Sequence, residues 1–547
     1  MARRCLLFII IILILIAPVL QGCEFFALVP PVQHQPPPPS PQQPQETPPD
    51  YDEPVQTSPP APPSPPSQGR FALRYDDAGT LNPLLTLSRD NILLSSLLYE
   101  SLFTLDSSFQ AQPVLCDTWE TEDYTRFTFV IKPDIAVNDG SVLTAYDVAY
   151  SFRQAMSRGR YVSRFDSVLT LEVDDDLTFR IELSAPNSRL FNLLDFPIIK
   201  SGTIDQRIPP GTGPYTIVEE GPPRLIRFHR HRDAAGIPLL IINLKTSGDN
   251  ELTQLFDDGS LSLIWDDPGD TFDIRLNRLH ETRFYDTTAL QFIGFNTSSI
   301  VFRDPDVRRA VSSSIERQYI VDEIMPGQSL AAPLALSPAF PWYDTAWEDN
   351  PLDPYQEMSL LFERAELKDY NDDSYLELAD GFGGYISFSI DFIVNSENTH
   401  KVQAAYRIAR TLRIAGLNIV VRELPWDRFI NALETGDFDM YYGETVLGGD
   451  FDLSSLLLPG PLNYGRTAST GYAPFIEDFL AARGPNEIRY ASSVLCERIR
   501  LNAPFAPILY KRYAIYTPLG AILSAELSPS SVFFNFTEWT INLAMLN

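Results

Sequence analysis

The chain has 547 residues, with 42 Lys and Arg against 71 Asp and Glu, which gives a formal charge of −29 at neutral pH. Hydrophobic residues make up 44% of the chain, an ordinary globular composition that can bury a large core. The excess of acid argues against nucleic-acid binding, because each phosphate contact needs a cation. We therefore expect no nucleic-acid partner, and two to four domains at about 150 residues per domain.

The N-terminus carries the pattern of a secretion signal. Arg3-Arg4 precede an apolar run, residues 6–17, which is shorter than the roughly 20 residues of a membrane span. The following Leu20-Gln21-Gly22-Cys23 resembles the lipobox of bacterial lipoproteins, in which the cysteine is acylated and becomes the mature N-terminus. We predict residues 1–22 as a signal peptide and Cys23 as the lipidation site. An uncleaved membrane anchor is the alternative.

A proline-rich segment follows this signal. Seventeen of the 46 prolines lie between Pro30 and Pro66, and such sequences favour polyproline II, which extends about 3.1 Å per residue. The polar residues between the prolines leave little apolar surface on which to fold. We predict residues 23–69 as a disordered stalk that tethers the rest of the chain to the outer face of the cytoplasmic membrane, on the cell-wall side. An SH3-type ligand is the alternative reading of the proline pattern.

From Arg70 onward the composition becomes ordinary, and strand and helix patterns alternate. Residues 127–131 (FTFVI) predict a strand, and residues 143–156 predict a helix entered at Thr144. The runs 169–173 and 177–183 predict a β-hairpin around three consecutive aspartates.

The clearest α/β unit lies in the C-terminal third. Its predicted elements are a helix over 399–415 ended by Gly416, a strand over 417–421, a helix over 426–433 stopped by Gly436, and a strand over 438–442. Strand–helix–strand order implies a parallel sheet covered by helices, so the predicted fold class is α/β. Ligands of open parallel sheets bind beyond the carboxyl ends of the strands. This directs attention to Tyr442, Glu444 and the loop that follows.

Motifs of enzyme chemistry are missing from the sequence. It contains no G-x-S-x-G, H-E-x-x-H, P-loop or G-x-G-x-x-G pattern, so we expect neither catalysis nor a cofactor. A hydrolase using Asp450, Asp452 or Glu444 is a weak alternative, because a chain with 71 acids contains carboxylate pairs by chance. His229 and His231 share one face of a predicted strand but lack a third metal ligand. We expect no metal there, nor at the three aspartates of the hairpin, which are typical of a solvated turn.

Cysteines are few in the globular part. Only Cys116 and Cys496 lie there, and no C-x-x-C motif occurs. Two alternatives are compatible with the sequence: one disulfide between these cysteines, or two separate buried thiols.

Several short stretches occur in an order that is known from one protein family. Asp139–Phe152 (DGSVLTAYDVAYSF) is very similar to a signature of the form DG-x-x-[LF]-TA-x-DV-x-[YF]-SF. The other landmarks are Thr80–Leu84, Leu98–Asp106, Gly211–Tyr215, Phe295–Thr297, Phe302–Asp304, Asp306–Ala310, Gly436–Asp439 and Asn502–Pro504. From about Arg70 to its end, the chain therefore resembles the family 5 extracellular solute-binding proteins, the peptide- and nickel-type receptors of ABC importers.

The resemblance implies a hinged, two-lobed fold of the type II periplasmic-binding-protein kind. Lobe one would comprise residues 70–285, with an extra subdomain at about 96–200 and a C-terminal return at 505–547. Lobe two would comprise residues 286–504, and residues 284–296 would form a hinge strand. The expected protein is a monomer without enzyme activity that works with an ABC permease complex.

The resemblance also implies a place for the solute. The N-terminal ammonium of a peptide cannot be buried without a carboxylate partner, and Asp450 is the counterpart of the acid that peptide-binding members supply. Glu444 stands roughly where those members carry a Trp. With Asp452 nearby, this predicts a preference for peptides or small solutes with cationic groups. We also expect Tyr442, which leads into this loop, to contact the solute. Asn463 and Tyr464 on the next loop are expected to face the solute as well, unless they form an ordinary turn.

Two other functions are compatible with these features. A peptide-sensing or signalling lipoprotein would keep the fold and have no transport partner. A wall-associated adhesive protein would account for the long stalk. The segment 228–232 (FHRHR) departs from the N-P-x-Y-W pattern of transport members, so a solute-facing role for it does not transfer.

Overall fold

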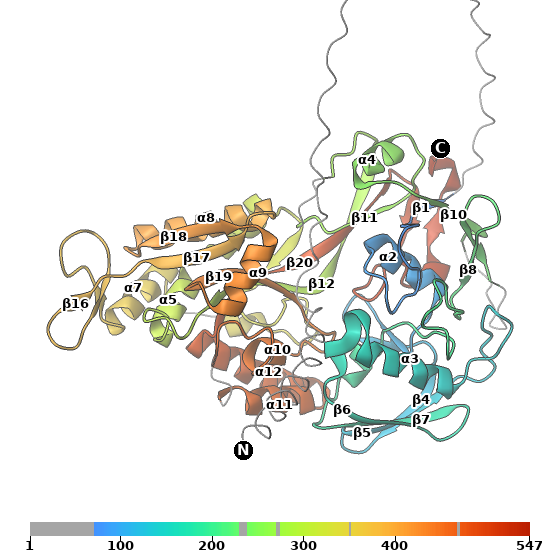
Figure 1. The fold of residues 1–547 in the computed structure, drawn as a ribbon, viewed down its shortest axis with the longest axis horizontal. Coiled ribbons are helices and arrows are strands. Elements are labelled where there is room, and N and C mark those ends of the chain that lie inside the picture. Colours follow the sequence, from blue (N-terminus) through green and yellow to red (C-terminus); the bar gives the residue numbers. More distant parts are fainter. Residues whose placement is uncertain (1–70, 229–237, 270–273, 349–351, 468–470, 547) are drawn as a thin grey trace, which may run out of the picture.

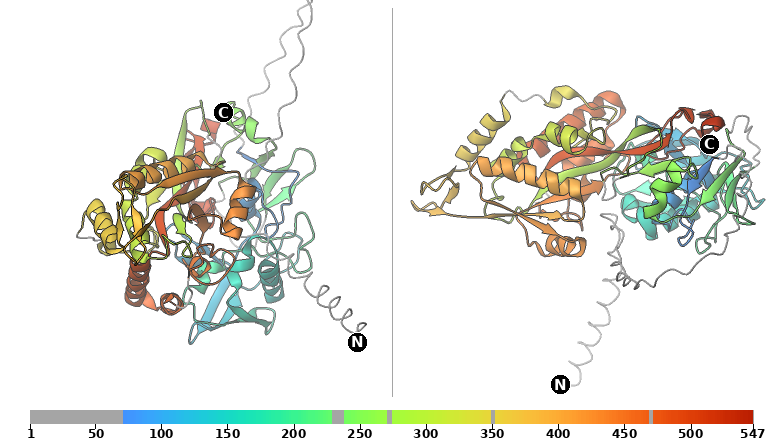
Figure 2. Two further views of the ribbon diagram at one scale, coloured as in Figure 1. Left: turned by 60° about the vertical axis from the view of Figure 1, so that its left-hand side comes forward. Right: turned by 90° about the horizontal axis from the view of Figure 1, so that it is seen from above.

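The computed structural model describes residues 71–228, 238–269, 274–348, 352–467 and 471–546. The predicted signal peptide, Cys23, the predicted stalk, His229 and His231 lie outside the described residues. Two lobes lie side by side and are joined by two long strands, β12 (His280–Phe295) and β20 (Phe505–Pro518). Figure 2 shows these strands running from one lobe into the other. The predicted two-lobed α/β fold is confirmed.

Lobe one is built from two four-stranded sheets. The first has the order β1-β10-β9-β8 and the second, which belongs to the predicted subdomain, has the order β4-β5-β7-β6. The strands of the first sheet are β1 (Ala72–Arg74), β10 (Ile241–Lys245), β9 (Arg224–Arg227) and β8 (Tyr215–Val218). Those of the second are β4 (Cys116–Thr121), β5 (Arg126–Ile131), β7 (Thr178–Leu183) and β6 (Val168–Val173). The helices are α2 (Arg89–Leu98), α3 (Ala145–Ser157) and α4 (Asp249–Asp257), and β2 (Phe103–Leu105) pairs with β3 (Ala111–Pro113).

A single sheet passes from lobe one into lobe two. Its order is β11-β20-β12-β19-β17-β18, with β13 paired to β20. The remaining strands of this sheet are β11 (Ile264–Asp266), β19 (Met440–Val446), β17 (Ile390–Asn395), β18 (Ile419–Leu424) and β13 (Ser329–Ala331). The main helices of lobe two are α5 (Pro305–Ser314), α7 (Pro354–Arg364), α8 (Thr399–Ile414), α9 (Trp426–Thr435), α11 (Ala473–Ala481) and α12 (Gly484–Asn502). Short elements complete the lobes: α6 (Arg317–Tyr319), α10 (Ser454–Leu457), a sheet of β14 (Leu367–Lys368), β15 (Glu377–Ala379) and β16 (Tyr385–Ile386), and the pair β21 (Ile522–Ser524) and β22 (Thr540–Ile541).

The sheet of lobe two is buried on both faces. Neighbouring residues of β12, such as Phe292 and Ile293, enter two different apolar cores, and Tyr441 and Tyr442 of β19 do the same. Lobe one has its own core, to which the C-terminal segment contributes Phe533 and other side chains. The predicted boundaries at 285/286 and 504/505 stay a prediction, because β12 and β20 serve both lobes.

Several predicted helices, and the predicted hairpin, are found in the structure, and the helices have well-defined ends. The helix entered at Thr144 has a capping box, in which Asp147 accepts a hydrogen bond from the Thr144 backbone N–H at 2.9 Å. The predicted hairpin is the antiparallel pair β6–β7. Gly416 and Gly436 adopt φ of +96° and +77° just beyond α8 and α9, the left-handed geometry that ends a helix.

The Gly211–Tyr215 stretch is a turn that leads into β8. A Cβ atom added to Gly213 would lie 2.2 Å from the carbonyl carbon of Leu98, and one added to Gly211 would lie 2.4 Å from the ring of Tyr99. Glycine is therefore required for close packing of this turn on α2. Cys116 and Cys496 are free buried thiols in the cores of different lobes, so the disulfide alternative is wrong.

Candidate functional site

The sequence directs attention to the carboxyl ends of the parallel strands in lobe two. β17 pairs in parallel with β18 and β19, so their carboxyl ends lie at one edge, as predicted for this unit. β19 carries Tyr442 and Glu444 and pairs with β12 on its other side, where Gln291 lies opposite Glu444. The loop after β19 holds Asp450 and Asp452.

Glu444 belongs to a buried chain of alternating charges, which we call the ion chain. Lys511 Nζ lies 2.6 Å from Asp267 Oδ2 and 3.3 Å from Glu444 Oε1, and Lys401 Nζ lies 2.9 Å from Glu444 Oε2. The side chains of Lys511 and Asp267 are 2% and 8% exposed, and those of Lys401 and Glu444 are 10% and 14% exposed. Gln291 Nε2 donates to Glu444 Oε2 at 2.9 Å, and Tyr442 Oη donates to Gln291 Oε1 at 2.9 Å. Both carboxylate oxygens of Glu444 therefore have partners within the protein.

The neighbouring lysines keep the Glu444 carboxyl ionised despite its burial. Burial opposes the charge of Glu444, but Lys401 and Lys511 outweigh it and hold the pKa of the carboxyl far below its usual value. The same balance, with Asp267 and Glu444 as partners, raises the pKa of Lys511 above its ordinary value despite burial. For Asp267 burial is the larger cause and raises the pKa, while Lys511 opposes the rise.

The ion chain joins the two lobes. Asp267 directly follows β11 on the side of lobe one, whereas Lys401 lies in the first turn of α8 in lobe two. Beside it, Asn398 Nδ2 donates to the backbone oxygen of Gly269 at 2.8 Å, in a buried position. Asn398 also caps α8 by accepting from the Lys401 backbone N–H at 3.0 Å.

Asp450 lies at a second contact between the lobes, which we call the seam. The seam joins lobe-one residues 187–192 to lobe-two residues 449–451 and 479–482. Asn187 Nδ2 donates to Asp450 Oδ2 at 2.9 Å, and Asn192 Nδ2 donates to the backbone oxygen of Gly449 at 2.9 Å. The ring of Phe451 meets that of Phe109 of lobe one edge-on, with centroids 5.1 Å apart.

Asp452 is half-buried behind the seam. Its Oδ1 accepts from the backbone N–H of Ser454 at 2.8 Å and from its hydroxyl at 2.6 Å. Burial, followed by the charge of Asp450, raises the pKa of Asp452 to about 6, while the bonds from Ser454 and the charge of Arg189 oppose the rise. Asp450 and Asp452 thus lie close together, whereas the partners of Glu444, the third acid of the predicted site, are Lys401, Lys511 and Gln291.

Asn463 and Tyr464 hold a turn within lobe two. Asn463 Nδ2 donates to the backbone oxygen of Leu458 at 3.2 Å, and its Oδ1 accepts from the Thr467 backbone N–H at 3.0 Å. The ring of Tyr464 packs edge-on against that of Tyr441, 6.3 Å away. Contact of any predicted site residue with a solute stays a prediction.

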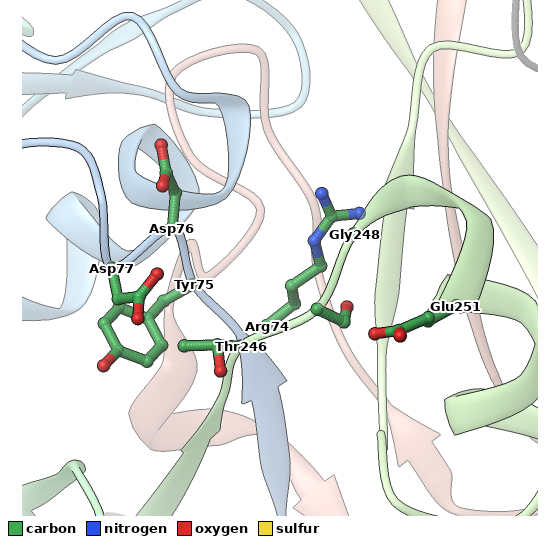
Figure 3. A pocket seen from close by; sticks show the side chains of 8 residues that line it. Arg74, Tyr75, Asp76, Asp77, Thr246, Gly248 and Glu251 are labelled. Atoms are coloured by element: carbon green, nitrogen blue, oxygen red, sulfur yellow. The ribbon is translucent and has the colours of Figure 1, made fainter. Parts of the chain in front are cut away.

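A cavity in lobe one was not singled out by the sequence. It holds about 400 Å³ and lies where the parallel strands β1 and β10 end and α4 begins. Figure 3 shows the carboxylates of Asp76, Asp77 and Glu251 around it together with Arg74. Arg74 is paired with Asp90 at 3.0 Å and with Asp249 at 2.5 Å. The strand-end position of Tyr75-Asp76-Asp77, and Thr246-Ser247-Gly248 before a helix, are the signals that could have located it.

The structure also bears on metal sites, on the aspartates of the hairpin turn and on membrane-spanning helices. Among the described residues, no group of three or more His, Cys, Asp or Glu side chains could hold a metal ion. In the hairpin turn, Asp175 accepts from the Leu177 and Thr178 backbone N–H groups, and Asp174 pairs with Arg180. Within the part of the chain that the structure covers, no helix is both long and apolar enough to span a membrane.

The sequence of the chain matches a known protein family. Residues 110–459, more than half of the chain, match the family described as "Bacterial extracellular solute-binding proteins, family 5 Middle". The chain belongs to this family. The resemblance found in the sequence is thereby confirmed, and the family is one of receptors.

Similar members of the family bind different solutes. This solute-binding protein is 21% identical to the oligopeptide-binding protein AppA of Bacillus subtilis over 479 residues, 82% of this chain and 86% of AppA. The solved structure of that AppA with a nonapeptide has a TM-score of 0.63 at 18% identity and covers 86% of this chain and 99% of its own. NikA of Brucella suis, solved with Fe(III)-EDTA, has a TM-score of 0.68 at 17% identity and covers 86% and 100%. These structures establish the shared fold.

The ion chain predicts a strong effect of Glu444→Gln on stability. The substitution leaves Lys401 and Lys511 with one carboxylate between them in a buried place, so we expect the free energy of unfolding to fall by about 3–5 kcal/mol. Urea denaturation measures the change. The control is Glu497→Gln, which removes a half-exposed partner of Arg500 at 2.7 Å and should cost less than about 1 kcal/mol. Equal losses for the two variants would contradict the prediction.

The raised pKa of Asp452 predicts a pH dependence of stability. With a folded pKa of about 6 against an ordinary 3.8, the folded state binds more protons than the unfolded state between these values. The contribution of Asp452 to stability therefore falls as pH rises from about 4 to 6. We expect the unfolding free energy of the native protein, minus that of Asp452→Asn, to decrease across this window and then level off. A difference that is flat from pH 4 to 8 would count against it.

Proposed function

We propose that this solute-binding protein is a lipid-anchored extracytoplasmic receptor that captures a peptide, or a similar cationic solute, between its lobes and delivers it to an ABC importer. The observation that carries the proposal is the single sheet that crosses both lobes and leads, at the end of β19, into an acidic loop facing lobe one. Such a geometry allows a small relative movement of the lobes to expose or cover that loop.

The charge distribution supports a solute with a positive end. The whole chain carries a formal charge of −29, and two regions at strand ends are acidic: the Asp450–Asp452 loop of lobe two and the lobe-one cavity with Asp76, Asp77 and Glu251. A peptide ammonium or a Lys or Arg side chain needs a carboxylate when it is buried. We propose that Asp450 and Asp452 meet this group and that Glu444, at the end of β19, adds to the acidic character of the strand end that leads into their loop.

The peptide class is supported by a relative that bears the name oligopeptide-binding protein and matches along most of its length. Peptide main chains offer donors and acceptors that a strand end or loop can satisfy whatever the side chains are. Capture then requires contacts that exist only when the lobes are together, because a solute with equal affinity for both arrangements shifts nothing.

The anchor rests on the N-terminal pattern alone. Arg3-Arg4, the apolar run and the Leu20–Cys23 sequence support export and acylation, and the proline-rich stretch supports a spacer. Family members are extracellular proteins by description. A tether of this kind would keep a receptor next to its permease in a cell without an outer membrane.

Peptide binding tests the receptor function directly. We expect tri-lysine to raise the melting temperature of the protein more than tri-alanine, and tri-glutamate to have no effect. At 100 times Kd a bound peptide stabilises by about 2.7 kcal/mol. Asp450→Asn should weaken tri-lysine binding about tenfold or more, a loss of roughly 1.4 kcal/mol, as measured by calorimetry. Asp174→Asn, in a solvated turn, is the matched control. Unchanged affinity in both Asp450→Asn and Glu444→Gln would refute the assigned acids.

Acylation at Cys23 predicts a change in partition. The full-length protein expressed in a Gram-positive host should enter the detergent phase of Triton X-114, because an acyl chain adds about 0.8 kcal/mol of membrane affinity per buried CH₂. Cys23→Ser should move the protein to the aqueous phase and into the culture medium. Cys5→Ser, which lies upstream of the apolar run, is the control and should leave partition unchanged. Retention of the Cys23→Ser protein in the membrane would instead support an uncleaved anchor.

A further inference from the structure

Arg189 is a deeply buried cation within the seam. It lies in lobe one directly before the turn 190–193, and only 4% of its surface is exposed. In Figure 1, α11 of lobe two, which contains Phe479, lies next to the extra subdomain of lobe one. Asn187 positions the segment, because its Oδ1 accepts from the Arg189 backbone N–H at 2.9 Å.

The guanidinium of Arg189 makes its contacts with lobe two. Its Nε donates to the backbone oxygen of Asp450 at 3.2 Å, and its Nη2 donates to that of Phe479 at 3.0 Å. The Cζ atom lies 4.1 Å from the centre of the Phe479 ring, a cation–π contact. Its Nη1 is buried and has no hydrogen-bond partner among the described residues. An arginine of one lobe is therefore inserted into the other with part of its donor capacity unused.

The nearest acids do not pair with this cation directly. The charges of Asp450 and Asp452 act on Arg189, opposing the effect of burial, which lowers the pKa of the guanidinium to about 10. No carboxylate among the described residues lies within ion-pair distance of it, whereas Asp450 Oδ2 is bonded to Asn187. A buried cation and two acids thus share one site without the close contact that offsets desolvation.

We propose that Arg189 is a resident cation, which holds the lobes together at the Asp450–Asp452 loop while no solute is bound and gives up this place to the positive group of the solute. The clamp between the lobes follows from the contacts of Arg189 alone. The replacement by solute rests on the proposed function and names the regulation of the same site.

The exchange sets a requirement on the solute. A group that replaces Arg189 must be positive, to meet the charges of Asp450 and Asp452, and it must donate hydrogen bonds, to satisfy the backbone oxygens of Asp450 and Phe479. Ammonium and guanidinium groups do both. A clamp also lowers the apparent affinity of the receptor, because only the fraction of molecules with separated lobes can accept a solute.

The clamp is tested on the unliganded protein by small-angle X-ray scattering, which needs no knowledge of the solute. We expect Arg189→Gln to increase the radius of gyration and Arg189→Lys to increase it less. Arg308→Gln is the matched control. Arg308 is similarly buried and donates to four backbone oxygens, all within lobe two, so its loss should lower stability without separating the lobes. Asn187→Ala, which removes a different contact of the seam, should act in the same direction as Arg189→Gln.

The exchange is tested with tri-lysine as the probe, by calorimetry. We expect Arg189→Gln to bind tri-lysine about tenfold more tightly than the native protein, since the competent fraction rises. Weaker binding would overturn the exchange, because Arg189 would then support the solute-bound form. An unchanged radius of gyration in both Arg189→Gln and Asn187→Ala would overturn the clamp. Absence of tri-lysine binding in every variant, with an increased radius, would refute the proposed function and leave the clamp supported.

Discussion

Alternating charges from Asp267 through Lys511 and Glu444 to Lys401 hold the centre of this molecule together. Each of these four groups is nearly excluded from water, and each charge is stable there only because the next has the opposite sign. Because Asp267 belongs to lobe one, Lys511 to a strand shared by both lobes, and the other two to lobe two, the arrangement of the lobes and the ionisation of the cluster depend on one another. A movement that separated Asp267 from Lys511 would expose a buried ammonium group or require water to enter.

The seam forms a second contact of a different kind. It consists of side-chain amides, one guanidinium and backbone oxygens, which can exchange protein partners for water or solute at lower cost than a buried ion pair. The ion chain therefore suits the fixed end of a hinge, and the seam suits the end that opens. Long strands such as β12 and β20 provide the mechanical link, and the register of β12 on β20 is interrupted between Asp286 and Leu290, where a bulge permits local bending.

Local sequence signals were sufficient for the secondary structure that carries the site. The capping box at Thr144 and the left-handed glycines 416 and 436 act within a few residues, and their elements formed where predicted. The acids of the loop after β19 were also found, because a strand end is a local feature.

The partners of the predicted acids could not be found from the sequence. Asp267, Lys401 and Lys511 are far from Glu444 along the chain, and a sequence that holds 71 acids gives no indication of which ones have a cation beside them. One signal was available: Lys511 interrupts the apolar run Phe505–Pro518, and a lysine in a strand buried on both faces requires a carboxylate.

The two thiols have a consequence for how the protein matures. Cys116 and Cys496 occupy separate cores, and burial raises the pKa of each to about 12. At neutral pH only about one thiol in 10⁵ is then ionised, and the thiolate is the form that reacts with oxidants. Neither thiol is placed to enter disulfide exchange in the native state, so the described fold contains no disulfide that an oxidoreductase would have to form.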